Sequence, residues 1–192
     1  MEKIILASKS PYRKKLMDDI GLPYDIVVGN ADETPIESFS FREQLKEISM
    51  RKALTVFEMT KPAGNRIIIA AEQNIVFHGV MLGKPQSIEE ARENIKDMEG
   101  SDKIYACTGN AILHVKDNKI INCINECDIA KMRLAHFPDE ILSDYLSKNS
   151  PLTKCGGISI LDTPTLELTE GNISTAIGLT IEYVKEMLTT IY

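Results

Sequence analysis

The stretch RIIIAA at residues 66–71 decides the fold class. It is a continuous apolar run with a polar loop before it and the polar triplet at residues 72–74 after it. A short run of this kind predicts a strand that is buried on both faces and ends at Ala71. Such strands are typical of α/β proteins, in which helices cover both sides of the sheet. We therefore expect an α/β fold.

The segments around this stretch alternate between strand and helix patterns. A Ser10-Pro11 start and the Ser87…Glu90 capping box mark two of the helices. Strands are predicted over residues 3–7, 24–28, 75–77, 80–82, 103–109, 111–115, 120 onward, 158–161 and 166–170, and helices over 11–20, 41–59, 87–100, 138–148 and 180–188. This order favours a mixed sheet over a regular βαβ winding.

The composition limits the possible partners and the compartment. The chain has 192 residues and no linker-like segment, so we expect a single domain over residues 1–192. A net charge of -6 argues against a general affinity for nucleic acid or anionic membranes. No apolar run suits a signal peptide or approaches the ~20 residues of a membrane span, which predicts a soluble, cytoplasmic protein. The four cysteines form no C-x-x-C pair, and no zinc pattern is present.

The junction LASKSPYRKK at residues 6–15 concentrates hydroxyl and basic side chains in an acidic chain. Ser10 is the expected N-cap of the helix that follows. A helix N-terminus offers unpaired N–H groups and a positive dipole end, and this combination binds anions such as phosphates. The alternative is that Ser10 only caps the helix and that Arg13 and its neighbouring lysines are a solvated surface. The local pattern alone does not decide between these interpretations.

Two further lysines are candidates for contacting phosphates. Lys84 lies between a glycine and a proline, so its backbone is restrained and its ammonium can act as a point charge. Lys52 lies on the flank of the apolar stripe of the helix predicted over residues 41–59. The alternatives are a surface turn for Lys84 and a lysine whose stem covers apolar surface for Lys52.

Two acidic sites, with three residues in all, are candidates for binding a metal ion or activating water. Glu72 follows the predicted buried strand, and ligands of open α/β sheets bind beyond the carboxyl ends of strands. A carboxylate there can hold a divalent cation or accept a proton from water. Asp32 and Glu33 form a second acidic site on a loop. The alternative for all three is ordinary exposure to solvent.

Read together, these motifs resemble those of the Maf family of nucleotide pyrophosphatases. The opening at residues 5–13 is similar to the family's L-A-S-x-S-P-R-R, and the match extends in order to about Leu179. The other matching segments are Asp32-Glu33, Arg51-Lys52-Ala53, AAEQNIV at 70–76, LGKP at 82–85, residues 100–109 and KCGGI at 154–158. No single motif is decisive, but the ordered set is specific.

The resemblance implies a fold, a reaction and partners. It implies a mixed central sheet in an elongated, two-lobed Maf/ITPase-like fold with a cleft between the lobes. Members of the family are usually homodimers, so the resemblance also implies a homodimer. It implies hydrolysis of a nucleoside triphosphate, ordinary or modified, to the monophosphate and pyrophosphate with a divalent metal, Mg²⁺ or Mn²⁺. The family is also linked to inhibition of septum formation.

The resemblance also implies roles for individual residues. The implied catalytic residues are Glu72, Lys84, Arg13 and Lys52. The implied substrate-binding residues are Ser8, Ser10, Tyr12, Gln73 and Lys154, and the implied metal ligands are Glu33 and Glu72. Five of them match the family in type: Ser8, Arg13, Glu33, Lys52 and Lys84.

Several positions depart from the family's pattern. Tyr12 replaces an arginine and removes a fixed charge. Glu72 replaces the aspartate that is expected to activate water, so its carboxylate reaches one methylene further. Gln73 replaces a threonine, Thr153 an aspartate and Leu161 a glutamine.

These departures leave three hypotheses. The first is a metal-dependent nucleoside triphosphate pyrophosphatase with shifted substrate choice. The second is a nucleotide-binding protein with weak or lost catalysis that acts through a partner in cell division. The third is an unrelated structural α/β protein, which nucleotides would not stabilise against melting.

Overall fold

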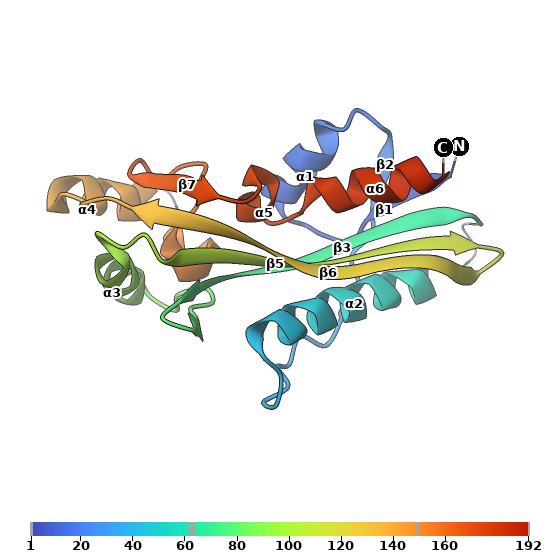
Figure 1. Ribbon diagram of the computed structural model, residues 1–192, viewed down its shortest axis with the longest axis horizontal. Helices are drawn as coiled ribbons and strands as arrows, with labels where there is room; N and C mark the ends of the chain where they lie inside the picture. The colour runs from blue at the N-terminus through green and yellow to red at the C-terminus, as the bar shows by residue number, and fades with distance from the viewer. Residues whose placement is uncertain (1, 62–63, 149, 192) are drawn as a thin grey trace. The chain divides into compact units, whose positions relative to one another are not determined.

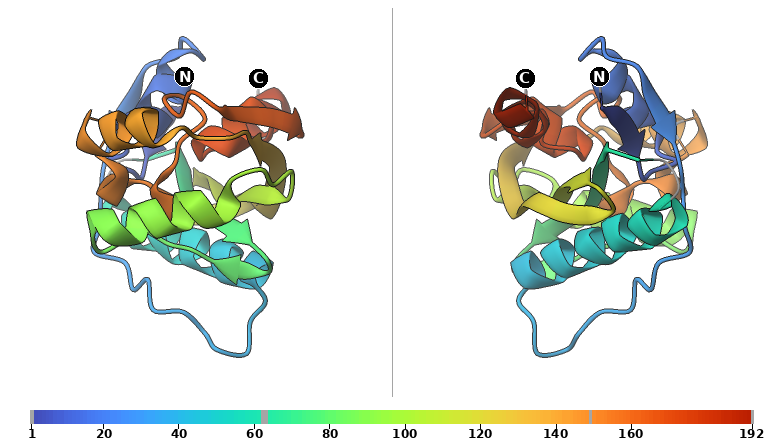
Figure 2. Two further views of the ribbon diagram at one scale, coloured as in Figure 1. Left: turned by 90° about the vertical axis from the view of Figure 1, so that its left-hand side faces the viewer. Right: turned by 90° about the vertical axis from the view of Figure 1, so that its right-hand side faces the viewer.

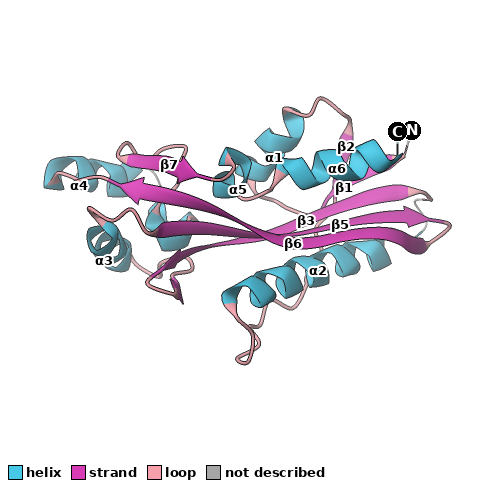
Figure 3. Cartoon of the chain, viewed as in Figure 1, coloured by secondary structure: helices cyan, strands magenta, loops and turns pink. Residues whose placement is uncertain are grey.

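The computed structural model describes residues 2–61, 64–148 and 150–191. Figure 3 shows its helices and strands. In chain order these are β1 (Lys3–Leu6), α1 (Pro11–Asp18), β2 (Tyr24–Ile26), α2 (Phe41–Met59), β3 (Arg66–Phe77), β4 (Val80–Met81), α3 (Ile88–Met98), β5 (Ile104–Lys116), β6 (Lys119–Leu134), α4 (Asp139–Lys148), the short 3₁₀ turns Pro151–Thr153 and Cys155–Gly157, β7 (Leu166–Glu170), α5 (Ile173–Ile177) and α6 (Ile181–Ile191).

The strands form one mixed sheet, which confirms the fold class expected from the sequence. In the described part of the chain the sheet has seven strands in the order β2-β1-β3-β5-β6-β7, with β4 paired to β3. β1 runs parallel to both β2 and β3, whereas the β3–β4 and β6–β7 pairs are antiparallel. Both residues of the turn between β5 and β6, Asp117 and Asn118, have positive φ, as tight two-residue hairpins require.

The prediction that the strand over RIIIAA ends at Ala71 is wrong. β3 continues for 12 residues, through Glu72, Gln73 and Asn74, to Phe77. A strand can continue through polar residues when their side chains find hydrogen-bonding or ion-pair partners, and here each of the three has one. Glu72 pairs with Lys52, the Gln73 amide donates to the carbonyl of Ala176, and Asn74 accepts from the Gly83 N–H. Glu72 therefore lies within a strand, not beyond its carboxyl end.

Two other strand predictions are corrected. The separate strands expected over residues 103–109 and 111–115 are one strand, β5. The strand expected over residues 158–161 is a turn, in which the Thr163 hydroxyl accepts from the Ser159 N–H and the Thr163 N–H donates back to the Ser159 carbonyl. The Thr163 hydroxyl thus gives this backbone a hydrogen-bond partner in place of a neighbouring strand. The apolar pattern of residues 158–161 does not reveal this partner.

The chain divides into two compact units, each built from separated segments. Unit 1 comprises residues 1–72, 108–128 and 178–192, and unit 2 comprises residues 73–107 and 129–177. The strands β3, β5 and β6 contribute residues to both.

In unit 1, helices cover both faces of the sheet. On β5, Gly109 faces α2 at the backbone of Leu45, whereas the next side chain, Asn110, bonds with Thr180 just before α6. Adjacent strand residues point to opposite faces, so α2 and α6 lie on opposite sides, as Figures 1 and 2 show. The α2 side is packed with apolar side chains from β1, α2, β3 and β5, among them Ile5, Val56, Ile68 and Leu113.

The close approach of α2 to β5 gives a first prediction, concerning stability. A Cβ placed on Gly109 would lie 2.2 Å from the Leu45 carbonyl oxygen, a contact with backbone that cannot move aside easily. We expect Gly109→Ala to lower the free energy of unfolding by about 2–3 kcal/mol in urea titrations. Gly29→Ala is the control, because there the new Cβ meets side-chain atoms of Thr55 and Met59, which can rotate away. Equal effects of the two variants would contradict the proposed backbone clash.

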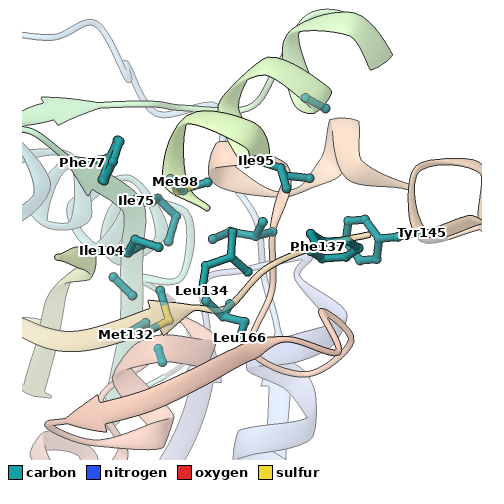
Figure 4. Close-up of a cluster of buried hydrophobic side chains, with 14 of the residues drawn as sticks. Ile75, Phe77, Ile95, Met98, Ile104, Met132, Leu134, Phe137, Tyr145 and Leu166 are labelled. Carbon is teal, nitrogen blue, oxygen red and sulfur yellow. The ribbon is translucent and has the colours of Figure 1, made fainter. Parts of the chain in front are cut away.

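Unit 2 has its own apolar core, drawn in Figure 4. Side chains from β3, α3, β5, β6, α4 and β7 meet there, including Ile75, Ile95, Ile104 and Leu134, together with Phe137 from the segment between β6 and α4. The Tyr145 ring packs against Phe137, and its hydroxyl donates to the Gly157 carbonyl at 2.9 Å. This core therefore fixes the loop at residues 154–163, which carries Lys154.

Candidate functional site

The junction between β1 and α1 has the capped geometry that the sequence predicts. Ser10 adopts an extended conformation, and its side chain accepts from the Arg13 N–H, with Pro11 at the first helical position. The Ser8 hydroxyl, which is buried, accepts from the Ser10 N–H at 3.2 Å. Tyr12 is half-buried on the first turn. Ser8 and Ser10 thus hold the backbone at the start of α1.

The Arg13 guanidinium ties this junction to the rest of unit 1. Its Nη1 donates to the Ala71 carbonyl at 2.7 Å and to the Ser8 hydroxyl at 3.3 Å, and its Nε donates to the Gly178 carbonyl at 2.8 Å. Ala71 immediately precedes Glu72 on β3. Arg13 therefore fixes the backbone next to Glu72, in addition to any charge that it offers to a ligand.

Two carboxylates of unit 1 converge on one ammonium group. The Lys52 Nζ lies 2.5 Å from Glu72 Oε2 and 3.0 Å from Glu33 Oε1. Lys52 comes from α2, Glu72 from β3, and Glu33 from the loop between β2 and α2. The Lys52 and Glu72 side chains are 17% and 23% exposed, while that of Glu33 is 59% exposed. The structure thus brings together three of the predicted residues, which are far apart in the sequence.

Arg51 holds the acidic loop beside this cluster. Its guanidinium lies 3.6 Å from the Asp32 carboxylate and donates to the Thr34 carbonyl at 3.0 Å. The hydrogen bonds from Thr34 are the main cause of a lowered pKa of Asp32, and Arg51 contributes further. Asp32 is therefore engaged within its own loop, whereas Glu33 faces Lys52. The sequence alone does not indicate this role of Arg51, although Arg51 directly precedes Lys52 in a matching motif.

In unit 2, Lys84 is exposed on a loop whose backbone is well anchored. The Gly83 N–H donates to the Asn74 side chain at 2.8 Å, and the Gly83 carbonyl accepts from Gly156 at 2.5 Å. Gly83 has a φ of +61°, which L side chains rarely adopt. Asn74 is a positioning residue that the sequence does not reveal: Asn74 and Gly83 flank the predicted strands at residues 75–77 and 80–82, but no local pattern pairs the Asn74 side chain with the Gly83 N–H.

Gln73 and Lys154, also in unit 2, engage the protein itself. The Gln73 amide donates to the carbonyls of Thr175 and Ala176, at 3.3 and 2.8 Å. Lys154 is buried, with its Nζ 2.5 Å from Asp162 Oδ2 and 5.1 Å from the centre of the Tyr145 ring. In this structure Asp162 holds the Lys154 ammonium. Asp162 has no counterpart among the predicted residues.

The Lys154–Asp162 pair gives a prediction for stability. Because the Lys154 side chain is only 3% exposed, removing its partner leaves a poorly compensated charge, although the 29% exposure of Asp162 admits some water. We expect Asp162→Asn to lower the free energy of unfolding by about 1–2 kcal/mol in urea titrations. Asp102→Asn, which breaks an exposed pair with Lys131, should have little effect. A neutral result for Asp162→Asn would contradict this account of the burial of Lys154.

The described residues contain neither a cluster of metal-binding side chains nor a membrane-spanning helix. In residues 2–61, 64–148 and 150–191, no three or more histidine, cysteine, aspartate or glutamate side chains gather as a metal site. Among the helices described, none combines the length and apolar character needed to cross a membrane. The functional roles assigned to the ten predicted residues, from Ser8 to Lys154, stay predictions.

Comparison with curated proteins identifies relatives along nearly the whole chain. A protein named dTTP/UTP pyrophosphatase from Thermotoga petrophila is 31% identical over 188 residues, covering 97% of this chain and 88% of the relative. Proteins of the same name from Caldicellulosiruptor bescii and Methanococcoides burtonii are 29% and 30% identical, covering 98% and 83% of this chain and 94% and 79% of the relatives.

Comparison with solved structures gives a weaker similarity. A nucleoside-triphosphatase, also called dITP/XTP pyrophosphatase, from Mycobacterium abscessus matches with a TM-score of 0.41 and 12% identity, covering 98% of this chain and 93% of that one. The model of the family described as Maf-like protein, in contrast, matches residues 3–191. The chain therefore belongs to the Maf-like protein family.

Proposed function

We propose that this protein is a nucleoside triphosphate pyrophosphatase, which hydrolyses its substrate to the monophosphate and pyrophosphate. Membership of the family and relatives named dTTP/UTP pyrophosphatase support the reaction type. The observation that carries the proposal is the convergence of Glu33 and Glu72 on Lys52, next to the junction that Arg13 fixes. The relatives' names make dTTP and UTP the first substrates to test.

The acidic pair fits a divalent metal of the kind that nucleotide enzymes use. Glu33 and Glu72 already hold one cation, the Lys52 ammonium, within 3.0 Å of an oxygen of each. Mg²⁺ prefers oxygen ligands and is usually held by one or two carboxylates together with water and substrate phosphates. Two carboxylates therefore suit a metal that arrives with its nucleotide. When bound, such a metal would neutralise charge on the phosphates and polarise the bond that breaks.

Glu72 is the residue that we assign to the attacking water. Its carboxylate is held on β3, a rigid element, with its neighbour Ala71 fixed by Arg13. In the proposed reaction a water oxygen attacks the α-phosphorus, Glu72 orients this water and accepts its proton, and the α–β anhydride bond breaks to release pyrophosphate. A positioned general base typically contributes 10²–10⁴-fold to a rate.

The basic and hydroxyl groups have the complementary task of binding the triphosphate. We assign phosphate contacts to Lys52 and Lys84, whose ammonium groups can neutralise the charge that develops on the leaving pyrophosphate. Ser8, Ser10 and Tyr12 surround the N-terminus of α1, where backbone N–H groups favour anions. Arg13 would act mainly by positioning this junction.

Other features of the proposal stay predictions. The homodimer and the role in septum formation rest on the family resemblance. The cytoplasmic location and the independence of nucleic acid and membranes rest on the composition and net charge of the chain. Gln73 and Lys154 are proposed substrate contacts that would have to exchange their present hydrogen bonds for contacts with substrate.

The test is release of pyrophosphate, with the monophosphate identified, from a panel of ordinary and modified nucleoside triphosphates in Mg²⁺ and in Mn²⁺. The proposal expects turnover of at least one nucleotide, dTTP and UTP being the first candidates. Thermal stabilisation by nucleotides without any turnover would instead favour a nucleotide-binding protein that acts through a partner. If nucleotides cause neither turnover nor stabilisation, both the pyrophosphatase and the nucleotide-binding hypotheses are rejected.

A further inference from the structure

The Lys52 ammonium is placed where a metal ion shared by Glu33 and Glu72 would also have to lie. It is within hydrogen-bonding distance of both carboxylates, at 3.0 and 2.5 Å, and its side chain is mostly buried. The three groups together carry one net negative charge. Without the ammonium, two facing carboxylates would repel each other and attract a cation strongly.

The two cations cannot share this position. Mg²⁺ binds carboxylate oxygens at about 2.0–2.1 Å and demands near-octahedral geometry. An ammonium group that donates to Glu72 and lies 3.0 Å from Glu33 occupies the space that such a shell needs and cancels half of the charge of the two carboxylates. Lys52 must therefore move aside before Glu33 and Glu72 can together hold a metal ion.

A triphosphate supplies a reason for that movement. Lys52 is a flexible side chain on α2, and its ammonium is a compact charge that can turn from the carboxylates toward phosphate oxygens. When a nucleotide arrives with its metal, its phosphates would pair with the Lys52 ammonium, and the carboxylates of Glu33 and Glu72 would bind the metal. The exchange conserves ion pairing throughout.

We propose that Lys52 is a resident cation that competes with the divalent metal for Glu33 and Glu72, so that the free protein binds metal weakly and a triphosphate recruits it. This inference rests on the proposed function for the identity of the triphosphate. It assigns Lys52 a regulatory role in addition to phosphate binding: the ammonium cancels half of the charge of the acidic pair and keeps the pair closed to metal until substrate is present.

The test measures Mn²⁺ binding to the nucleotide-free protein, by the loss of the electron paramagnetic resonance signal of free Mn²⁺. We expect Lys52→Met to bind Mn²⁺ about tenfold or more tightly than the unsubstituted protein, because a competing charge is gone. Lys52→Arg restores a cation and should return binding toward the original level. Lys46→Met is the matched control on the same helix, since Lys46 pairs with Glu126 and touches neither carboxylate in its described contacts.

A second arm tests the acidic pair and the nucleotide. Adding Glu33→Gln to Lys52→Met should remove the gain in Mn²⁺ affinity, since one of the two carboxylates is neutralised. An analogue of dTTP or UTP with a methylene bridge between the α- and β-phosphorus should raise Mn²⁺ affinity in the unsubstituted protein, beyond the affinity of the analogue alone. If Lys52→Met proves unfolded by circular dichroism, Lys52→Gln replaces it.

The outcomes separate this inference from the proposed function. Unchanged Mn²⁺ affinity in folded Lys52→Met or Lys52→Gln would overturn the competition, even if the unsubstituted protein releases pyrophosphate. Tight Mn²⁺ binding to the unsubstituted, nucleotide-free protein would overturn it as well. A gain in Lys52→Met that Glu33→Gln removes would support the competition, even if no nucleotide in the panel is hydrolysed.

Discussion

Replacing Glu72 with glutamine is expected to lower the rate of pyrophosphate release by about 10²–10⁴-fold, the usual contribution of a positioned general base. Glutamine keeps the length and approximate shape of the side chain but can no longer accept a proton from water. It also loses the charge that attracts Lys52 and a metal ion. The measurement is steady-state release of pyrophosphate from the best substrate of the panel, with melting temperature recorded to confirm folding.

Two further variants make this result specific. Glu37→Gln is the control, because Glu37 is an exposed loop residue; we expect it to leave the rate unchanged. Glu72→Asp moves the carboxylate back by one methylene toward the arrangement usual in the family. A displacement of about 1 Å can change a rate by roughly 10²-fold. A gain or a loss of rate in Glu72→Asp therefore shows which side-chain length the site requires at position 72. Full activity of Glu72→Gln would remove Glu72 from the mechanism.

The elements that the sequence predicts well are those specified by local signals. Helix α2 begins and ends where predicted, because Ser40 and Glu43 form a complete capping box and an apolar stripe follows. Strand β7 also has the predicted bounds. The hairpin turn between β5 and β6 is encoded by polar residues that accept positive φ. The decisive contacts of α2 and of the turn lie within a few residues of one another, whereas β7 has its predicted bounds although it pairs with residues 131–134 of β6.

The elements that the sequence predicts poorly depend on contacts between distant residues. Glu72 looks like the end of a strand until its partner Lys52, 20 positions away, is known. Gln73 finds its acceptors more than 100 positions later. Asp162 is missed for another reason: it lies only 8 positions after Lys154, but no local pattern indicates that Lys154 is buried and pairs with it. The family motifs selected Ser8, Glu33 and Lys52, but not the residues that hold them in place.

Arg66 also has a role that the sequence does not reveal, because its position there is simply the start of a buried strand. Its side chain is fully buried, and burial lowers its pKa. It donates to the Thr60 hydroxyl at 3.0 Å and to the carbonyls of Gly64 and Phe57 at 2.6 and 3.2 Å. It also reaches the Asn118 side chain at 3.3 Å. Arg66 therefore joins the C-terminal end of α2 to the start of β3 and the β5–β6 turn.

We expect Arg66→Met to lower the free energy of unfolding by about 3–5 kcal/mol, a large loss for a single substitution, because the buried Thr60 hydroxyl and three further acceptor oxygens lose their donor at once. Arg66→Lys should recover only part of this loss, since a single ammonium cannot reproduce the forked geometry of the guanidinium. The measurement is urea denaturation followed by circular dichroism. Arg133→Met, which removes an exposed arginine paired with Glu167, serves as the control and should change stability little. If Arg66→Met and Arg133→Met destabilise the protein equally, the buried guanidinium does not organise this end of unit 1, and α2 is held there by its apolar contacts alone.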